Sequence, residues 1–184
     1  MTAQERMARI EKLISFYKND NVNYVAVDEA GRRHGVSVVV YRLNVPGVFI
    51  PDGAQAGGLV ALYREGLDRI HTILSQLDMV QLGEMSSGCD NPETFTVVDD
   101  TAEAVRGVLS GVIETHPLGA LFDITVYDDG GHEVPPREYP PCIICEEDSS
   151  VCKKEHRHSD AEILDRIDTM LLVNGYYDEV DIAN

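Results

Sequence analysis

The sequence of 184 residues contains no tryptophan, has only 15 lysine and arginine residues against 32 acidic residues, and lacks any long apolar run. Without about 18 or more consecutive apolar residues, an ordinary membrane-spanning helix is excluded. The formal net charge of −17 argues against nucleic-acid binding, which requires clustered cations to displace phosphate counterions. The start of the chain also lacks the charged-then-apolar pattern of a signal sequence. We therefore expect a cytoplasmic protein without nucleic-acid or membrane partners.

The chain contains only four cysteines, and three of them lie close together in the sequence. In a chain without an export signal, such a cluster indicates metal or redox chemistry rather than a secreted disulfide framework. Three thiolates and one imidazole form the complete donor set of a structural zinc site, here Cys142, Cys145, Cys152 and His158. The alternatives are a reduced thiol cluster, an oxidised Cys-x-x-Cys pair, or His156 as the fourth ligand.

Hydrophobic periodicity predicts an alternation of strands and helices around one core, which 43% apolar residues are sufficient to build. The chain is predicted to begin with a helix at 3–18 and a strand at 22–28. The elements that follow are a strand at 36–44, a helix at 55–77, strands at 80–85 and 95–99, a helix opened by Asp100 with Glu103, and a strand at 121–127. From residue 36 onward this is the split βαβ order. We therefore predict an α+β protein with a ferredoxin-like antiparallel sheet, an extra N-terminal helix and an extra hairpin strand.

The sequence predicts a core at residues 1–138, followed along the chain by two smaller parts. Residues 139–176 are expected to form a Cys/His knuckle and a closing helix, whose start is marked by the capping-box spacing of Ser159 and Glu162. Residues 177–184 are expected to form an acidic tail.

The predicted topology concentrates several loops at one end of the sheet. The last strand should lie antiparallel to the first and beside it, so that Gly119 to Asp123 meets Asn44 to Gly47. The turn at Ser86 to Pro92 should close the same end. Because loops rich in glycine, proline and asparagine let a ligand approach backbone N–H groups, we predict the active site there.

Four ordered blocks of the chain support a more specific interpretation: Leu43 to Gly47, Pro92 to Asp99, His116 to Asp123, and the segment from Cys142 to Ser159. Over about residues 5 to 172 they resemble the citrate lyase holo-acyl-carrier-protein synthases, also called apo-citrate lyase phosphoribosyl-dephospho-CoA transferases. The resemblance implies transfer of the prosthetic group of 2′-(5″-triphosphoribosyl)-3′-dephospho-CoA to a serine of the apo acyl carrier protein subunit of citrate lyase. Pyrophosphate is released, and Mg²⁺ held by a carboxylate is implied.

The chain departs from the pattern of this family at two positions of the block from His116 to Thr125, and it also lacks the lysine often found a few residues after Pro46-Gly47. The family sequence His-Pro-Leu-Gly-Arg-Leu-Phe-Asp-x-Asp is matched here with Ala120 in place of the arginine and Thr125 in place of the second aspartate. A second hypothesis is therefore a family member that binds the carrier protein or a nucleotide without turnover. A third is a zinc-stapled ligand sensor unrelated to citrate metabolism.

The resemblance assigns roles to residues at the predicted active site. Asp123 is expected to hold Mg²⁺ in catalysis, and His116 is expected either to terminate a helix or to act as a general base. The remaining candidates are expected to contact the CoA-like donor or the acidic carrier protein, and they are Asn44, Pro46, Gly47, Gly119, Thr125, Lys153, Lys154 and Arg157.

Overall fold

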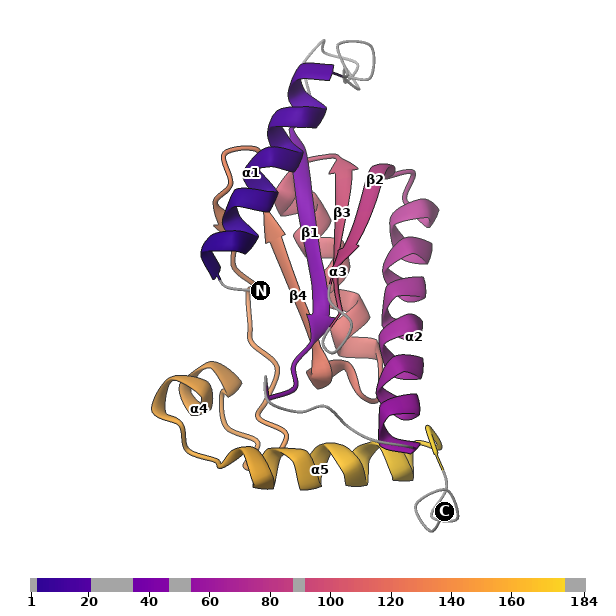
Figure 1. Ribbon diagram of the computed structural model, residues 1–184, viewed down its shortest axis with the longest axis vertical. Helices are drawn as coiled ribbons and strands as arrows, with labels where there is room; N and C mark the ends of the chain where they lie inside the picture. Colours follow the sequence, from indigo (N-terminus) through magenta and orange to yellow (C-terminus); the bar gives the residue numbers. More distant parts are fainter. Residues whose placement is uncertain (1–2, 21–34, 47–53, 88–91, 178–184) are drawn as a thin grey trace.

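The fold is built on an antiparallel sheet, seen in a computed structural model that describes residues 3–20, 35–46, 54–87 and 92–177 (Figure 1). The sheet has the strand order β2-β3-β1-β4-β5. Its strands are β1 (Val36–Leu43), β2 (Val80–Ser87), β3 (Glu93–Asp99), β4 (Phe122–Tyr127) and the two-residue β5 (Glu133–Val134). The mixed helix-and-sheet class and the antiparallel arrangement predicted from the sequence are therefore confirmed.

Strand β1 lies at the centre of the sheet because its side chains are apolar on both faces. All but two of its eight residues are buried, as expected for a strand covered on each side. It pairs antiparallel with β3 and with β4, so the first and last long strands are neighbours, as predicted. This pairing determines which loops meet at each end of the sheet.

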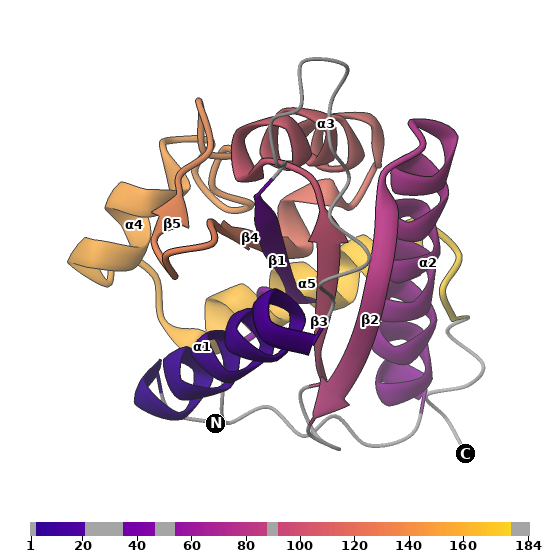
Figure 2. The same cartoon turned by 90° about the horizontal axis from the view of Figure 1, so that it is seen from above.

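Helices cover the two faces of the sheet unequally (Figures 1 and 2). One face packs against α2 (Ala54–Gln76) and α3 (Ala102–Thr115). Helix α5 (Asp160–Val173) crosses the end of the sheet beside α2 (Figure 1), and all three helices share a large apolar core with β1 and β4. The other face carries α1 (Ala3–Asp20), whose Ile10 is fully buried in a smaller cluster with Val38, Val40, Phe95, Val97 and Tyr127. Burial of apolar side chains on both faces is the main favourable contribution to folding.

Helix caps explain where α3 and α5 begin. For α5 the predicted capping box is present. The Ser159 hydroxyl accepts a hydrogen bond from the Glu162 amide, and the Glu162 carboxylate accepts one from the Ser159 amide. For α3 the predicted cap at Asp100 is wrong by one residue. Thr101 is the N-cap and its hydroxyl accepts from the Ala104 amide at 3.3 Å, while Asp100 accepts from the Thr101 amide at 2.6 Å.

Two predictions concern segments near the limits of the described residues. The predicted hairpin strand at 22–28 lies outside them. Tyr177, which the sequence assigned to the acidic tail, is buried in the larger core, and its hydroxyl donates to the Asp168 carbonyl at 3.1 Å. The packed part of the chain therefore includes this residue. Within the described ranges, no helix has the length and apolar character needed to cross a membrane.

The short connection from α3 to β4 depends on close backbone packing at Gly119. This residue begins the 3₁₀ turn η1 (Gly119–Leu121) and is buried. A Cβ atom added to Gly119 would lie 1.8 Å from the carbonyl oxygen of Ile113. No side chain fits there, so Gly119 has a structural function independent of any ligand.

We predict that Gly119→Ala lowers the free energy of unfolding by about 2 kcal/mol or more, because the added methyl group forces η1 away from α3. Gly107→Ala is the matched control, since nothing lies within 4 Å of its added Cβ on α3. The control should be neutral or stabilising by up to about 1 kcal/mol. Urea unfolding measures both, and equal stability of the two variants would contradict the packing argument.

Candidate active site at the end of the sheet

The end of β1 meets the connection that leads into β4. The backbone N–H of Asn44 donates to the Leu121 carbonyl at 2.8 Å, so the loop after β1 is held against η1. The predicted meeting of these two segments is thus confirmed at Asn44, which contacts Leu121, and at Leu43, which pairs with Phe122. Gly47 and the tip of the β2–β3 turn lie outside the described residues.

The Cys/His knuckle, residues Pro141 to His158, lies beside this end of the sheet (Figure 1). It opens with a bridge between Pro141 and Asp148 and continues into the short helix α4 (Ser149–Glu155). Asp148 caps α4 by accepting from the Ser150 amide at 2.7 Å. His156 ends the helix in the left-handed conformation, with φ of 50°, and so turns the chain back toward His158.

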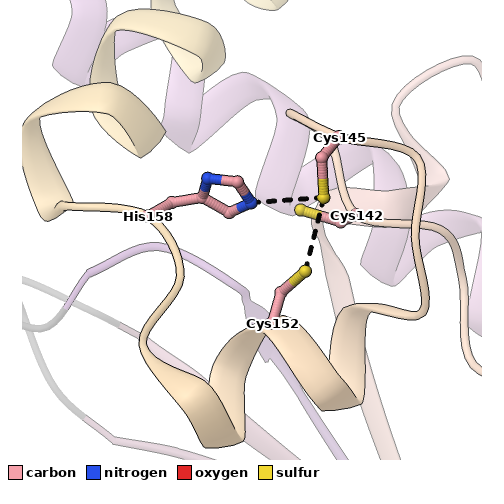
Figure 3. Close-up of side chains that lie close together, drawn as sticks. All are labelled: Cys142, Cys145, Cys152 and His158. Atoms are coloured by element: carbon pink, nitrogen blue, oxygen red, sulfur yellow. Dashed lines mark hydrogen bonds between the residues drawn. The ribbon is translucent and has the colours of Figure 1, made fainter.

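The four predicted metal ligands are brought together by this local fold (Figure 3). Their ligand atoms, from Cys142, Cys145, Cys152 and His158, all lie within 4.8 Å of one another. The Sγ atoms of Cys145 and Cys152 are 3.4 Å apart, and His158 Nε2 is 3.3 Å from Cys145 Sγ. Since Zn–S bonds of about 2.3 Å in a tetrahedron separate the sulfur atoms by roughly 3.8 Å, the cluster is close to this size. The cluster can therefore bind a metal ion such as zinc.

The thiol of Cys152 has a raised pKa in the cluster without a metal ion. Burial and the neighbouring Cys145 and Cys142 side chains raise the pKa of Cys152 to about 12. A metal ion would displace the proton and so bind the thiolate. His156, the alternative ligand from the sequence, is exposed and does not belong to the cluster.

A cavity of about 270 Å³ lies between the end of the sheet and the knuckle. Asn44, Pro46 and Ala120 line it from the sheet, while Cys142, Cys152, Lys153 and His158 line it from the knuckle. Of the three predicted knuckle cations, Lys153 lines the cavity. Lys154 and Arg157 are exposed outside it, and Arg157 Nε pairs with Glu155 at 2.6 Å.

Asp123 lies on the other side of the same sheet end, in a row of charged side chains that spans three strands. Arg42 in β1 donates to Asp123 Oδ2 from Nε at 2.8 Å and from Nη2 at 2.7 Å. Its Nη1 is 3.4 Å from Glu93 Oε1 in β3. Sequence patterns did not identify Glu93 or pair Arg42 with Asp123, because only the strand register reveals which residues are opposite each other. Asp123 is therefore an ion-paired carboxylate.

Thr125 shares the face of Asp123 but belongs to the next row of the sheet. Its cross-strand neighbours are Val40 and, beyond it, Phe95, both buried in the smaller core. Neither Asp123 nor Thr125 is among the residues that line the cavity. The structure thus places the predicted site residues in two adjacent groups.

His116 lies on the opposite face of β4 from Asp123. Its ring packs on Phe122, with centroids 4.7 Å apart, and side chains of adjacent strand residues point to opposite faces. Nδ1 accepts from the Leu118 amide at 3.0 Å, and Nε2 is 3.1 Å from Glu65 Oε1. Because both ring nitrogens have protein partners and the side chain is only 2% exposed, these contacts favour the structural role.

Through its carboxylate, Glu65 on α2 contacts residues that follow α3 and α5. It accepts from the Tyr176 hydroxyl at 2.6 Å and from Arg69 Nη2 at 2.9 Å, in addition to its contact with His116. The hydrogen bond from Tyr176 is the largest of the effects that lower the pKa of Glu65 to about 2. Burial lowers the pKa of His116 from its usual value, so this imidazole is neutral at neutral pH.

A second, shallower hollow of about 600 Å³ lies between α2 and α3. Charged and polar side chains line much of it, including Arg64, Glu65, Asp68 and Arg69. None of the residues predicted to contact the donor belongs to this groove.

Comparisons with known proteins agree on one family. The family model described as apo-citrate lyase phosphoribosyl-dephospho-CoA transferase matches residues 9–173, which include the sheet, the knuckle and α5. A relative from Vibrio cholerae, named "Probable apo-citrate lyase phosphoribosyl-dephospho-CoA transferase", is 27% identical over 148 residues, 76% of this chain and 79% of the relative. A relative from Escherichia coli O139:H28, with the same name without "Probable", is 24% identical over 159 residues, 83% of this chain and 81% of the relative.

The Glu65–His116 pair predicts acid sensitivity. Both groups have a lower pKa in the folded chain than in the unfolded chain, so the unfolded state binds more protons as the pH falls. The contribution of His116 is present above about pH 6.5 and decreases below it. That of Glu65 is present above about pH 4.5 and decreases toward pH 2.

We therefore expect the free energy of unfolding, measured with urea at pH 7.5, 6.5 and 5.5, to decrease with falling pH. His116→Gln should flatten this dependence, because the variant has no imidazole to protonate. An unchanged pH dependence in His116→Gln would contradict a buried neutral histidine at this position.

Proposed function

This chain belongs to the family of apo-citrate lyase phosphoribosyl-dephospho-CoA transferases, and on this basis we propose that it attaches the prosthetic group of citrate lyase at the end of its sheet. The donor is 2′-(5″-triphosphoribosyl)-3′-dephospho-CoA, and the acceptor is a serine of the apo acyl carrier protein subunit. The serine oxygen forms a bond to the phosphorus atom of the triphosphate group that is attached directly to its ribose. The bond from that phosphorus to the next bridging oxygen breaks, and pyrophosphate leaves while the serine proton passes to a base or to water.

One observation carries the proposed location of the donor: the cavity that joins the end of β1 to the knuckle. Its walls combine apolar side chains such as Val45 and Ile143 with the polar Asn44, the cationic Lys153 and the acidic Asp160. Ligand pockets commonly combine an apolar lining with few polar groups and measure roughly 300–1,000 Å³. At about 270 Å³ the cavity fits one part of the donor, and we assign it to the dephospho-CoA portion.

Zinc is the metal that best suits the Cys/His cluster. Three sulfur ligands and one imidazole match the soft donors that zinc prefers, and four protein ligands leave no open position for substrate. We propose a structural zinc that fixes α4 and the loop around Cys142 against the sheet end. We also propose a cytoplasmic location, where a reducing compartment would keep the thiols available for the metal.

Magnesium is proposed at the charged row on the basis of oxygen donors. Mg²⁺ is bound in enzymes by one or two carboxylates together with substrate phosphates, and Asp123 offers a carboxylate that is 21% exposed. The Thr125 hydroxyl, on the same face, is proposed as a further donor to the substrate. When bound, the ion would neutralise negative charge on the polyphosphate.

Docking of the carrier protein is assigned to the knuckle. The chain as a whole is acidic, but Lys153 and Lys154 occupy the last turn of α4 and Arg157 follows it. Acyl carrier proteins are usually acidic, so this local cationic surface can attract the partner that the net charge repels. The serine would then approach the cavity from the side of Lys153.

The strand order also supports the finer fold assignment. Strands β1 to β4 with α2 and α3 follow the order expected for a split βαβ sheet, with α2 between β1 and β2 and α3 between β3 and β4. We therefore propose a ferredoxin-like core to which α1 and the knuckle are additions. His116 is assigned a structural role in this core.

The proposed reaction is tested by mixing apo carrier protein, donor and Mg²⁺ with the zinc-loaded chain and measuring the mass of the carrier. A gain equal to the prosthetic group is expected. Absence of any gain, while an active homologue modifies the same carrier, would contradict the proposal. If transfer requires Ala120→Arg with Thr125→Asp, the natural chain is a binder.

In the same assay we predict that Lys153→Ala reduces kcat/KM for the donor by about 10- to 100-fold, because a charge-assisted phosphate contact is lost. Lys12→Ala is the control, since Lys12 is an exposed lysine on α1, across the sheet from the larger core. Equal kcat/KM values for the two variants would show that Lys153 does not contact the donor.

For the metal, elemental analysis of the purified chain should give one zinc per molecule. Cys152→Ser should lower zinc affinity about a hundredfold or more and lower the melting temperature, because a thiolate ligand is lost. Cys89→Ser changes the one cysteine outside the cluster and should retain full zinc content. Zinc retained after substitution of Cys152 would contradict the assigned ligand set.

A further inference from the structure

Glu65 on α2 connects two segments that each lead to a wall of the cavity between the sheet end and the knuckle, called the donor cavity below. Its Oε2 accepts from the Tyr176 hydroxyl at 2.6 Å, and its Oε1 is 3.1 Å from His116 Nε2. His116 follows α3, whereas Tyr176 follows α5. One carboxylate therefore joins two parts of the chain that are far apart in the sequence.

The first segment runs from His116 to the end of β1. The Leu118 amide donates to His116 Nδ1 at 3.0 Å, which fixes the start of η1. The last residue of η1, Leu121, accepts from the Asn44 amide at 2.8 Å. Asn44 lines the donor cavity, and so does Ala120 within η1. His116 thus supports the wall on the side of the sheet.

The second segment is α5 with the turn that follows it. The Tyr176 amide donates to the Leu171 carbonyl at 3.0 Å, which holds Tyr176 against the end of the helix. Nearer the start of α5, Ile163 lines the donor cavity. Arg166 Nε donates to the Ile143 carbonyl at 2.9 Å, and Ile143 lines the cavity from the knuckle. Because a packed helix is a rigid element, the position of Tyr176 constrains this second wall.

The chemistry of the two contacts makes Glu65 difficult to replace. His116 is 2% exposed, and because its Nδ1 accepts from Leu118, the proton of the neutral ring lies on Nε2 and faces Glu65. A buried N–H group that loses its acceptor is costly, and hydrogen bonds to an ionised acceptor are stronger than neutral ones. The hydrogen bond from Tyr176 lowers the pKa of Glu65, so the carboxylate is ionised at neutral pH.

We propose that Glu65 is a positioning residue of the donor site, and that it fixes the two walls of the donor cavity relative to each other through His116 and Tyr176. This inference rests on the proposed function, which assigns the cavity to the dephospho-CoA portion of the donor. Glu65 lies outside the lining of the cavity and does not contact the donor. It raises donor affinity by keeping η1 and α5 in the arrangement that binding requires, so that less ordering accompanies binding.

Binding of 3′-dephospho-CoA to the zinc-loaded chain, measured by isothermal titration calorimetry, tests the positioning role without turnover. Glu65→Ala should weaken binding by about tenfold, because both connections are lost. Glu65→Gln should restore most of the affinity, since its amide oxygen accepts from His116 and its NH₂ group can donate to the Tyr176 hydroxyl. Asp68→Ala is the matched control, because Asp68 is an exposed acid in the same groove, and it should match the natural chain.

A destabilised variant separates positioning from a general loss of stability. Val105 is buried in the larger core near the start of α3, whereas His116 follows the end of this helix. Val105→Ala should therefore lower the melting temperature and leave the affinity for 3′-dephospho-CoA unchanged.

Amide hydrogen exchange, measured by NMR, provides a local readout that needs no ligand. In Glu65→Ala the Asn44 amide should exchange about tenfold faster relative to the amide of Val39, in the middle of the same strand. A uniform loss of stability would leave this ratio unchanged.

An unchanged affinity for 3′-dephospho-CoA in a folded Glu65→Ala would overturn the inference. So would an equal loss of affinity in Val105→Ala, or an unchanged exchange ratio of Asn44 to Val39. If Glu65→Ala does not fold, Tyr176→Phe takes its place, because it removes only the hydroxyl donor. Its affinity should be lower than that of the natural chain, and an equal affinity would again overturn the inference.

Failure of this inference and failure of the proposed function give different results. If the carrier protein gains mass and Glu65→Ala binds 3′-dephospho-CoA as tightly as the natural chain does, the reaction stands and Glu65 is only structural. If exchange at Asn44 responds to Glu65→Ala but the natural chain neither binds 3′-dephospho-CoA nor modifies the carrier, the two walls are coupled and the assigned donor site is wrong.

Discussion

The antiparallel pairing of β1 with β3 on one side and β4 on the other is the constraint on which the rest of the structure depends. It brings the end of β1 against η1, where the Asn44 amide bonds to Leu121, and it aligns Glu93, Arg42 and Asp123 across three strands. The pairing is stable because both faces of β1 are apolar and covered. A shift of one residue would turn Arg42 into the larger core and separate it from Asp123.

The knuckle adds a second constraint, which acts on the other wall of the cavity. Four side chains of the segment Cys142 to His158 converge around one point, and α4 lies beside the end of the sheet. This arrangement places Lys153 at the cavity of a protein with a net charge of −17. A metal ion in the cluster would thus influence donor binding through position, without contacting the reacting phosphorus.

The sequence predicted those features that depend on local periodicity and on short spacings. The long strands and α2, α3 and α5 were recognised because their apolar residues repeat with the period of their structure, and the Cys/His cluster because its ligands lie close in sequence. The Ser159 cap was also visible. Thr101 was missed because Asp100 has equally good capping chemistry and only the backbone geometry distinguishes the two.

The candidate site was predictable only in part, for a physical reason. Asp123 and Asn44 were identified from their position at strand ends, but the contacts of Asp123 depend on register. Arg42 and Glu93 are separated by 51 positions, and nothing in either local sequence indicates that they meet. His116 is likewise separated from Asp123. It contacts Glu65 and Leu118 on the opposite face of β4, because the side chains of adjacent strand residues point to opposite faces.

The central claim is that the donor binds between the end of β1 and the knuckle. A crystal structure of the zinc-loaded chain with 3′-dephospho-CoA and pyrophosphate tests it most directly. The account predicts the dephospho-CoA portion in the cavity beside Asn44 and Lys153. Ligand bound instead in the groove between α2 and α3, with the cavity at the knuckle empty, would contradict it.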